Sequence, residues 1–302
     1  KELAEFGIPV VIFSGGEPLL REDFFELAEC ARQQGLRIAL STNGTLINGE
    51  VAGKIRDMGF AEVGISLDGT ESNNDYFRGQ EGAYQAALDG IRNCLALGLR
   101  VSLRLTITRF NYREIPAILR LTEDEGIDRI CFYHLAYSGR GGSLQKEDIN
   151  HAQKRSVIDL ISEHTLDMDR RGLHKEVLTV GNHADGVYLY MKEQKEGSPR
   201  AGKILDLLKM NGGNNSGIRI GAVDDRGNVH PDQFWWHYRL GNVRERTFGE
   251  IWADTSEPLL KGLRNRKNLL TGRCARCRYL DICNGNLRVR AEAVFNDVWA
   301  DD

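Results

Sequence analysis

Apolar runs alternate with amphipathic stretches along the first half of the chain. Five short runs rich in Val, Ile and Leu read as buried strands, and the stretches between them carry the apolar spacing of helices. Several helical stretches end at a glycine, as C-terminal capping requires. This alternation predicts βαβ units and an α/β fold with a parallel sheet or barrel. The predicted strands are Val10–Ser14, Arg37–Ser41, Glu62–Leu67, Arg100–Thr108 and Arg129–Leu135, and the predicted helices are Glu22–Gln34, Gly49–Met58, Ala83–Leu97 and Tyr112–Glu125.

Composition and charge describe an ordinary soluble globular protein. Of 302 residues, 41% are hydrophobic and 27% charged, which leaves room for one large domain and a smaller one. The net charge of −3 gives no reason to expect nucleic acid or an anionic membrane as a partner. No apolar run reaches membrane-spanning length and the first residues are no signal peptide, so we expect a cytoplasmic protein.

Two glycines and a carboxylate follow the first predicted strand, at Gly15, Gly16 and Glu17, with Pro18 after them. Open α/β sheets and barrels bind ligands at the C-terminal ends of their strands. Glycines there let the backbone approach a ligand closely, and Glu17 offers an acceptor for a cationic group. The alternative is a tight turn from strand to helix with a capping carboxylate, and the four residues alone do not separate the two.

Gly-Gly-Glu-Pro after a buried strand resembles the radical SAM family, in which this motif holds the amino group of S-adenosylmethionine. Ser41–Gly44, Ile65–Gly69 and the pair Arg104 and Asn111 match the family in the same order. The resemblance covers nearly the whole chain and implies a partial (β/α)6 barrel, with one further strand expected upstream. It also implies a radical-generating [4Fe–4S] cluster on a CxxxCxxC loop. That loop is absent from these residues, and its expected place lies before Lys1.

The chemistry of S-adenosylmethionine suggests roles for the polar residues at the strand ends. A zwitterion with a ribose needs an acceptor for its amine, donors for its carboxylate and acceptors for its hydroxyls. Glu17 suits the amine, Arg104, Ser66 and Asn43 suit the carboxylate, and Asp68 suits the hydroxyls or caps a turn. The predicted cofactor-binding residues are Gly15, Gly16, Glu17, Pro18, Ser41, Asn43, Ser66, Asp68 and Arg104.

The pattern changes near residue 210, and we place a domain boundary between residues 1–210 and 211–302. A short hairpin, then Leu240–Val243, then Phe248–Trp252 resemble the SPASM and twitch domains that hold auxiliary clusters in radical SAM proteins. The second domain is therefore expected to be a small auxiliary iron–sulfur domain.

Cys274, Cys277 and Cys283 follow this stretch with the spacing C-x2-C-x5-C. Thiolates at such spacing suit an iron–sulfur cluster or a structural zinc ion, and after a radical SAM barrel a [4Fe–4S] cluster is favoured. Leu287 and Asp232 stand where full SPASM domains carry further cysteines. We therefore expect one auxiliary cluster, with a fourth ligand that these cysteines do not supply.

The segments His230–Trp235, Leu240–Arg246, Asn182–Gly186 and Cys283–Glu292 resemble the radical SAM enzymes of heme d1 biosynthesis (NirJ type) and their relatives in the siroheme-dependent heme pathway. The resemblance implies removal of propionate side chains from a didecarboxysiroheme-type tetrapyrrole by a 5′-deoxyadenosyl radical, with an external electron donor. Aromatic and arginine side chains suit such a macrocycle, or they form the core of a small domain. The candidate substrate contacts are His134, Arg140, His183, His230, His237 and Arg239.

Two other functions remain open at this point. A SPASM-type enzyme that modifies peptides would normally carry more C-terminal cysteines and a peptide-recognition domain upstream. A metal-binding scaffold without catalysis would be favoured if the residues before Lys1 also lacked CxxxCxxC.

Overall fold

The computed structural model describes residues 1–302, which separate into two compact units. The barrel unit comprises Lys1–Tyr133 and Asp159–Thr179, and the auxiliary unit comprises His134–Ile158 and Val180–Asp302. This division follows contacts and not the sequence order, so the boundary that we place between residues 210 and 211 stays a prediction. No helix combines the length and the apolar character that crossing a membrane would need.

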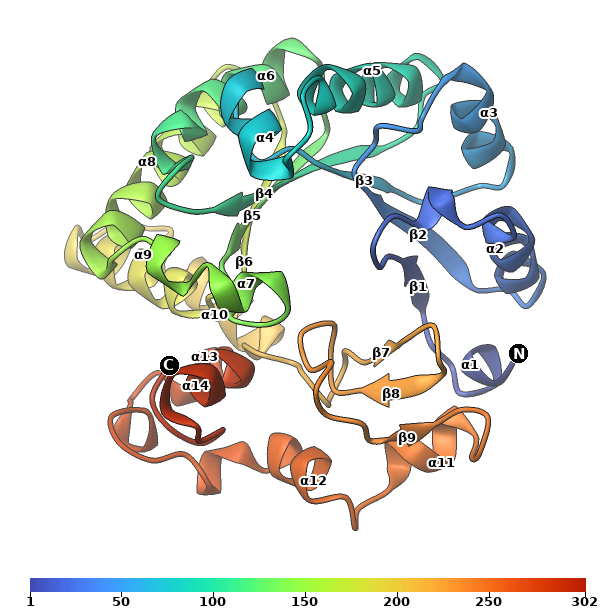
Figure 1. Ribbon diagram of the computed structural model, residues 1–302. Coiled ribbons are helices and arrows are strands. Elements are labelled where there is room, and N and C mark those ends of the chain that lie inside the picture. Colours follow the sequence, from blue (N-terminus) through green and yellow to red (C-terminus); the bar gives the residue numbers. More distant parts are fainter. The chain divides into compact units, whose positions relative to one another are not determined.

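The barrel unit is built on a six-stranded sheet whose strands are ordered as in the sequence, from β1 to β6. Strands β1 to β4 pair in parallel, and helices flank the outer side of the curved sheet (Figure 1). The predicted α/β partial barrel is thus confirmed. The strands are β1 (Val10–Phe13), β2 (Arg37–Thr42), β3 (Val63–Ser66), β4 (Val101–Ile107), β5 (Arg129–His134) and β6 (Glu176–Val180); the helices are α1 (Glu2–Glu5), η1 (Pro18–Leu20), α2 (Phe24–Gln33), α3 (Gly49–Asp57), α4 (Glu71–Arg78), α5 (Ala83–Ala96), η2 (Tyr112–Glu114), α6 (Ile115–Asp124) and α8 (His151–Arg170). The last residues of β5 and β6 and residues 151–158 of α8 are counted with the auxiliary unit.

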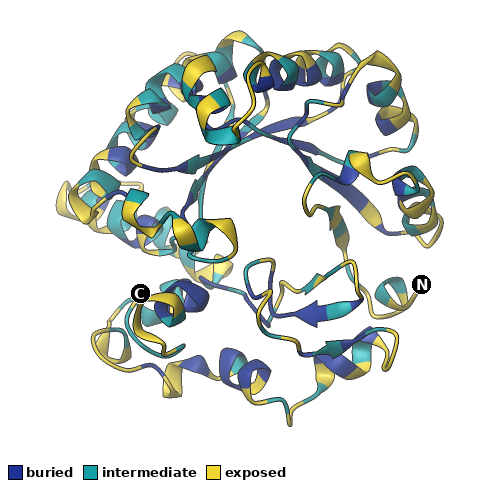
Figure 2. Ribbon diagram, viewed as in Figure 1, coloured by how far each residue is buried: buried dark blue, intermediate teal, exposed yellow.

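Alternation of side chains along the strands gives the sheet two different faces. Leu103, Leu105 and Ile107 of β4 are fully buried, whereas Arg104 and Thr106 between them are only partly buried. Because successive side chains of a strand point to opposite faces, one face of the sheet is apolar and the other carries polar groups. Figure 2 shows buried residues along the strands and exposed ones on the outer sides of the helices.

The structure contains one strand that the sequence pattern did not predict, β6, which extends the sheet beyond β5. The strand expected before Lys1 stays a prediction. Glu176–Val180 contains no fully buried residue, because a strand at the edge of a sheet has a neighbour on one side only. Its sequence therefore lacks the apolar run that marks the central strands.

The auxiliary unit contains a small antiparallel sheet of β7, β8 and β9 and a set of short helices. The predicted short hairpin is present as β7 and β8. The elements are α7 (Arg140–Ser143), η3 (Gln145–Glu147), α9 (Ala184–Lys195), α10 (Ala201–Asn211), β7 (Ala222–Val223), β8 (Asn228–His230), β9 (Gly241–Asn242), α11 (Phe248–Ala253), α12 (Pro258–Arg264), η4 (Arg266–Asn268), η5 (Cys274–Arg276), α13 (Leu280–Cys283) and α14 (Arg288–Phe295).

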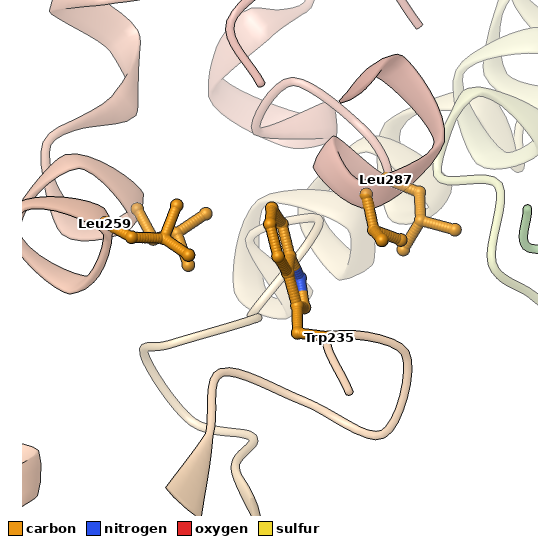
Figure 3. Close-up of a cluster of buried hydrophobic side chains, with 5 residues drawn as sticks. Trp235, Leu259 and Leu287 are labelled. Atoms are coloured by element: carbon orange, nitrogen blue, oxygen red, sulfur yellow. The ribbon is translucent and has the colours of Figure 1, made fainter. Parts of the chain in front are cut away.

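Trp235 forms the centre of the core in this unit. It is fully buried and lies between Leu259 and Leu287, with Leu263 and Val289 completing the cluster (Figure 3). Of the two interpretations of the aromatic residues, the structure thus favours the core role for Trp235. Leu287, at a position where full SPASM domains carry a cysteine, is part of the same core.

Candidate functional site

The carboxylate of Glu17 holds the loop after β1 against the end of β2. Its Oε1 accepts hydrogen bonds from the Thr42 hydroxyl (2.7 Å) and the Leu19 amide (3.1 Å), and Oε2 accepts one from the Asn43 amide (2.7 Å). A carboxylate has about four acceptor positions, so three bonds leave capacity for a further donor. Glu17 therefore both caps η1, as the turn interpretation required, and keeps room for a cation.

Gly15 and Gly16 leave open space in the same loop. Gly15 has φ +136°, a backbone conformation that residues other than glycine rarely adopt. A Cβ built on either glycine meets no atom within 4 Å. The following Pro18 is buried and begins η1. The loop thus presents exposed backbone beside the Glu17 carboxylate.

Arg104 of β4 reaches across β3 to β2. One terminal nitrogen, Nη1, donates to the Ser41 hydroxyl at 2.6 Å, and Nη2 lies 3.8 Å from Glu62. Its Nε is buried without a hydrogen-bond partner. Register places Ser66 opposite Arg104 and Gly64 opposite Ser41, so these residues of β2, β3 and β4 lie together on the polar face.

Asn43 is held by the turn that follows β2. Besides its amide bond to Glu17, its side-chain oxygen accepts from the amide and the hydroxyl of Thr45, both at 2.8 Å. The oxygen is thus engaged within the turn, and its NH2 group is the part of the side chain suited to a ligand carboxylate.

Asp68 is buried after β3 and pairs with Arg78. It also accepts a hydrogen bond from the Thr106 amide (2.7 Å), while its own carbonyl accepts from Asn111 (2.8 Å). Burial raises the pKa of Asp68 and the charge of Arg78 opposes that rise. These contacts give Asp68 a role in joining the ends of β3 and β4, which the sequence analysis did not predict.

A chain of buried polar side chains begins at His134 in the auxiliary unit. Its Nε2 lies 2.7 Å from Asp185, whose other oxygen accepts from Asn182 (2.6 Å), and Asn182 in turn accepts from Asn286 (2.8 Å). Nδ1 of His134 is buried without a partner. The structure thus brings together His134, the Asn182–Gly186 segment and the residues after Cys283.

His183, within that segment, donates its backbone amide to the Asn286 side chain at 2.7 Å. Burial lowers the pKa of its imidazole to about 4. The ring is therefore neutral near pH 7.

His230 and Arg239 are engaged with neighbouring protein groups. Nδ1 of the buried His230 lies 2.8 Å from the Tyr238 carbonyl and 3.1 Å from the Trp235 carbonyl, so the ring fixes the loop between them. Arg239 is half-exposed and donates to both oxygens of Glu245. This placement favours a loop-supporting role for His230.

His237 lines a cavity of about 630 Å³ in the auxiliary unit, together with Tyr137, Phe295 and other residues. The His237 side chain is 51% exposed and its Nε2 lies 2.8 Å from Glu292 of α14, which also lines the cavity. Arg140 lies in α7, between two glycines that line the same cavity. Among the candidate substrate contacts, His237 is thus the one that lines a hollow.

The three cysteines lie near one another but do not form a preassembled metal site. No group of three or more His, Cys, Asp or Glu side chains is close enough to hold a metal ion. Burial raises the pKa of Cys283 to about 11 and also raises that of Cys274. Three arginines nearby are buried: Arg266, Arg288 and Arg290.

Comparison with known proteins identifies the family of the chain. Residues 1–122 match the radical SAM superfamily. An Fe-coproporphyrin III synthase from Methanosarcina barkeri is 55% identical over 304 residues, which span 100% of this chain and 76% of that protein. The chain belongs to the radical SAM superfamily. A pre-heme d1 synthase from Dinoroseobacter shibae is 42% identical over 305 residues, spanning 100% of this chain and 75% of that protein.

A solved structure supports the fold of this radical SAM enzyme. Streptococcus suis SuiB bound to S-adenosylmethionine matches 100% of this chain and 67% of SuiB, with a TM-score of 0.76 and 18% sequence identity. At that identity the match shows the shared architecture. As a radical SAM enzyme, the protein uses S-adenosylmethionine and an iron–sulfur cluster.

The polar face of the barrel unit fits S-adenosylmethionine by its donors and acceptors. Arg104 retains an unpaired buried Nε for a carboxylate, Glu17 retains acceptor capacity for an amine, and the two glycines leave the backbone accessible. Sequence reasoning missed Thr42, which anchors Glu17, and Gly64, over which Arg104 passes. The signal available for Thr42 was its place between Ser41 and Asn43.

Proposed function

We propose that this radical SAM enzyme acts on an iron tetrapyrrole and forms Fe-coproporphyrin III. The observation that carries the proposal is the 55% identity to an Fe-coproporphyrin III synthase along the whole chain. The sequence motifs alone favoured heme d1 synthesis, with the heme-pathway step as the alternative, and the higher identity reverses that order. Pre-heme d1 synthesis is the second candidate, supported by 42% identity over the same residues.

The two candidate reactions differ in the side chains that leave the macrocycle. A coproporphyrin by definition carries methyl and propionate groups, so forming one from a didecarboxysiroheme-type substrate retains the propionates and removes acetate groups. The heme d1 type of reaction removes propionates instead. The identity of the remaining side chains therefore separates the two functions.

In this proposal Glu17 and Asn43 bind the amine and carboxylate of S-adenosylmethionine, with Arg104 as the bidentate partner of the carboxylate. When cluster and cofactor are bound, they supply a 5′-deoxyadenosyl radical that abstracts a hydrogen atom from the substrate. The cavity beside His237 offers apolar side chains such as Phe295 and a half-exposed imidazole, which suit a flat iron-containing macrocycle. An external reductant serves as the electron donor.

We further infer an auxiliary [4Fe–4S] cluster bound by Cys274, Cys277 and Cys283. The surroundings fit an anionic cluster because Arg266 and Arg288 are buried cations whose hydrogen-bond partners are neutral oxygens. Coordination would deprotonate the thiols, and burial raises the pKa of two of them, Cys274 and Cys283, in the free protein.

Product analysis tests the proposed function. The reconstituted full-length protein, S-adenosylmethionine, a reductant and didecarboxysiroheme are incubated without oxygen, and the tetrapyrrole products are identified by mass spectrometry. Fe-coproporphyrin III together with 5′-deoxyadenosine is the expected result. A product that has lost propionates would establish the second candidate instead. An unchanged tetrapyrrole, with S-adenosylmethionine cleaved normally, would exclude both reactions and reopen peptide modification.

A further inference from the structure

Arg288 is a buried cation with only part of its hydrogen bonds formed. Its side chain is fully buried, and Nη1 donates to the carbonyls of Val298 (3.1 Å) and Ala300 (2.6 Å). Nε and Nη2 are also buried, and no acceptor of the protein pairs with them. Burying cationic N–H groups without acceptors is costly, so such donors point to a ligand that accepts hydrogen bonds.

The guanidinium of Arg288 lies close to residues that adjoin two of the cysteines, Cys283 and Cys274. A Cβ built on Gly285, two residues after Cys283, would be 3.4 Å from Arg288 Nε. Arg288 also binds the carbonyl of Ala300, and the next residue, Asp301, accepts a hydrogen bond from the Cys274 amide at 2.8 Å. Both cysteines are near enough for their thiolate charges to act on the pKa of Arg288, against the lowering by burial.

Two neighbouring arginines provide a comparison within the same core. Arg290 is paired with the carboxylate of Asp302 through Nε and Nη2. Arg266 is buried like Arg288, but it donates to the oxygens of Leu263, Asn214 and Ser216. Of the three buried arginines, Arg288 is the one with unpaired donors.

We propose that Arg288 donates Nε–H and Nη2–H hydrogen bonds to sulfur atoms of the auxiliary cluster and thereby raises its reduction potential. The proposal rests on the auxiliary cluster of the proposed function. Reduction adds one electron to the cluster and makes its charge more negative by one. A fixed cation and N–H···S bonds stabilise this reduced form more than the oxidised form. Arg288 is thus a positioning residue for the cluster and has no contact with the reacting atoms.

Redox titration of the reconstituted protein tests the proposal. The auxiliary cluster is assigned as the electron paramagnetic resonance signal that Cys274→Ala abolishes. In Arg288→Met the reduced-to-oxidised ratio of this signal at a fixed potential is expected to fall about tenfold, equivalent to a shift of about 59 mV. Arg288→Lys keeps the charge and should shift less. Arg273→Met is the matched control, because this arginine adjoins Cys274 but its side chain is 90% exposed, and it should leave the potential unchanged.

A second measurement uses the unaltered residue and covers the case in which Arg288→Met fails to fold. Pulsed electron paramagnetic resonance on protein labelled with ¹⁵N-arginine should detect nitrogen coupled to the reduced auxiliary cluster, and Arg288→Lys should remove that coupling. A cluster with full iron content but no arginine coupling, or an unchanged potential in Arg288→Met, would overturn the role of Arg288 alone. Zinc in place of iron at the cysteines would overturn the auxiliary cluster, and the role of Arg288 with it.

Discussion

The guanidinium group of Arg104 lies directly against Gly64 in the neighbouring strand. A Cβ on Gly64 would be 2.2 Å from both Cζ and Nε of Arg104, far inside any real contact distance. Only glycine at this position lets Arg104 cross β3 and bind Ser41 on β2 at 2.6 Å. The glycine in the middle of a strand, which weakens strands in general, is here the condition for the position of the arginine.

Gly64→Ala should therefore weaken binding of S-adenosylmethionine about tenfold, or about 1.4 kcal/mol, because the methyl group displaces Arg104. Calorimetry on the reconstituted protein measures this affinity. Gly53→Ala is the control, since a Cβ at that position in α3 meets no atom within 4 Å. It should leave the affinity unchanged and stabilise the helix by up to about 1 kcal/mol. Equal affinities in wild type and Gly64→Ala would remove Arg104 from the cofactor site.

Thr42→Val should reduce both the stability of the protein and its affinity for S-adenosylmethionine. The change removes the hydroxyl that donates to Glu17 and accepts from the Gly44 amide, at an expected cost of about 1–2 kcal/mol in the free energy of unfolding. Thr122→Val is the matched control, because it also removes a buried hydroxyl, one that donates to the Ile118 carbonyl in α6. Only Thr42→Val is expected to change the affinity, and Glu17→Gln should lower it further. If Thr42→Val lost stability alone, Glu17 would serve the turn and not the cofactor.

The imidazole of His183 should make stability depend on pH. Its pKa falls from 6.5 to about 4 on folding, so the unfolded chain binds more protons between these values, and stability is lost as pH falls through 6.5. From pH 7 to pH 5 the loss from this group is about 2 kcal/mol. Chemical denaturation of wild type and His183→Gln at both pH values measures it. Between pH 7 and pH 5 the free energy of unfolding should fall less in the variant than in wild type. An equal fall in both proteins would show that the His183 imidazole is in contact with solvent.

Cys274→Ala and Cys277→Ala should each lower bound iron and sulfide by the content of one cluster. Iron and sulfide assays after anaerobic reconstitution measure this directly. Cys94→Ala is the control, because that thiol is buried and burial raises its pKa to about 12, which makes it a poor ligand. Unchanged iron in the two cysteine variants would contradict the assignment of the auxiliary cluster ligands.

His237→Ala and His230→Ala should have different effects. Loss of the half-exposed His237 should weaken tetrapyrrole binding, measured by absorbance titration, with little change in stability. Loss of the buried His230 removes contacts to two carbonyls and should lower the free energy of unfolding by about 1–3 kcal/mol. Uncoupled cleavage of S-adenosylmethionine should persist in His237→Ala. If His237→Ala bound the tetrapyrrole as wild type does, the contacts would have to be sought near His183 or Arg239.

The sequence by itself determined the central strands, the helices between them and the loops with local signatures. Each depends on residues close in the chain: apolar periodicity for β2 to β5, and two glycines before Glu17 for the first loop. The cysteine spacing is a local signal of the same kind. The sequence pattern did not predict the edge strand β6, because a strand with one neighbour buries little apolar surface.

Only the tertiary structure decided which partner each polar residue takes. Asp68 was open to a ribose or a turn, and the fold pairs it with Arg78 and the end of β4. His230 was a candidate substrate contact, and the fold places its ring against two loop carbonyls. The reason is physical: strand register and helix packing bring distant residues within 3 Å of one another, and the strength of a polar interaction depends on that distance and on the exclusion of water. The local pattern of the chain determines neither the distance between two polar groups nor the exclusion of water from them.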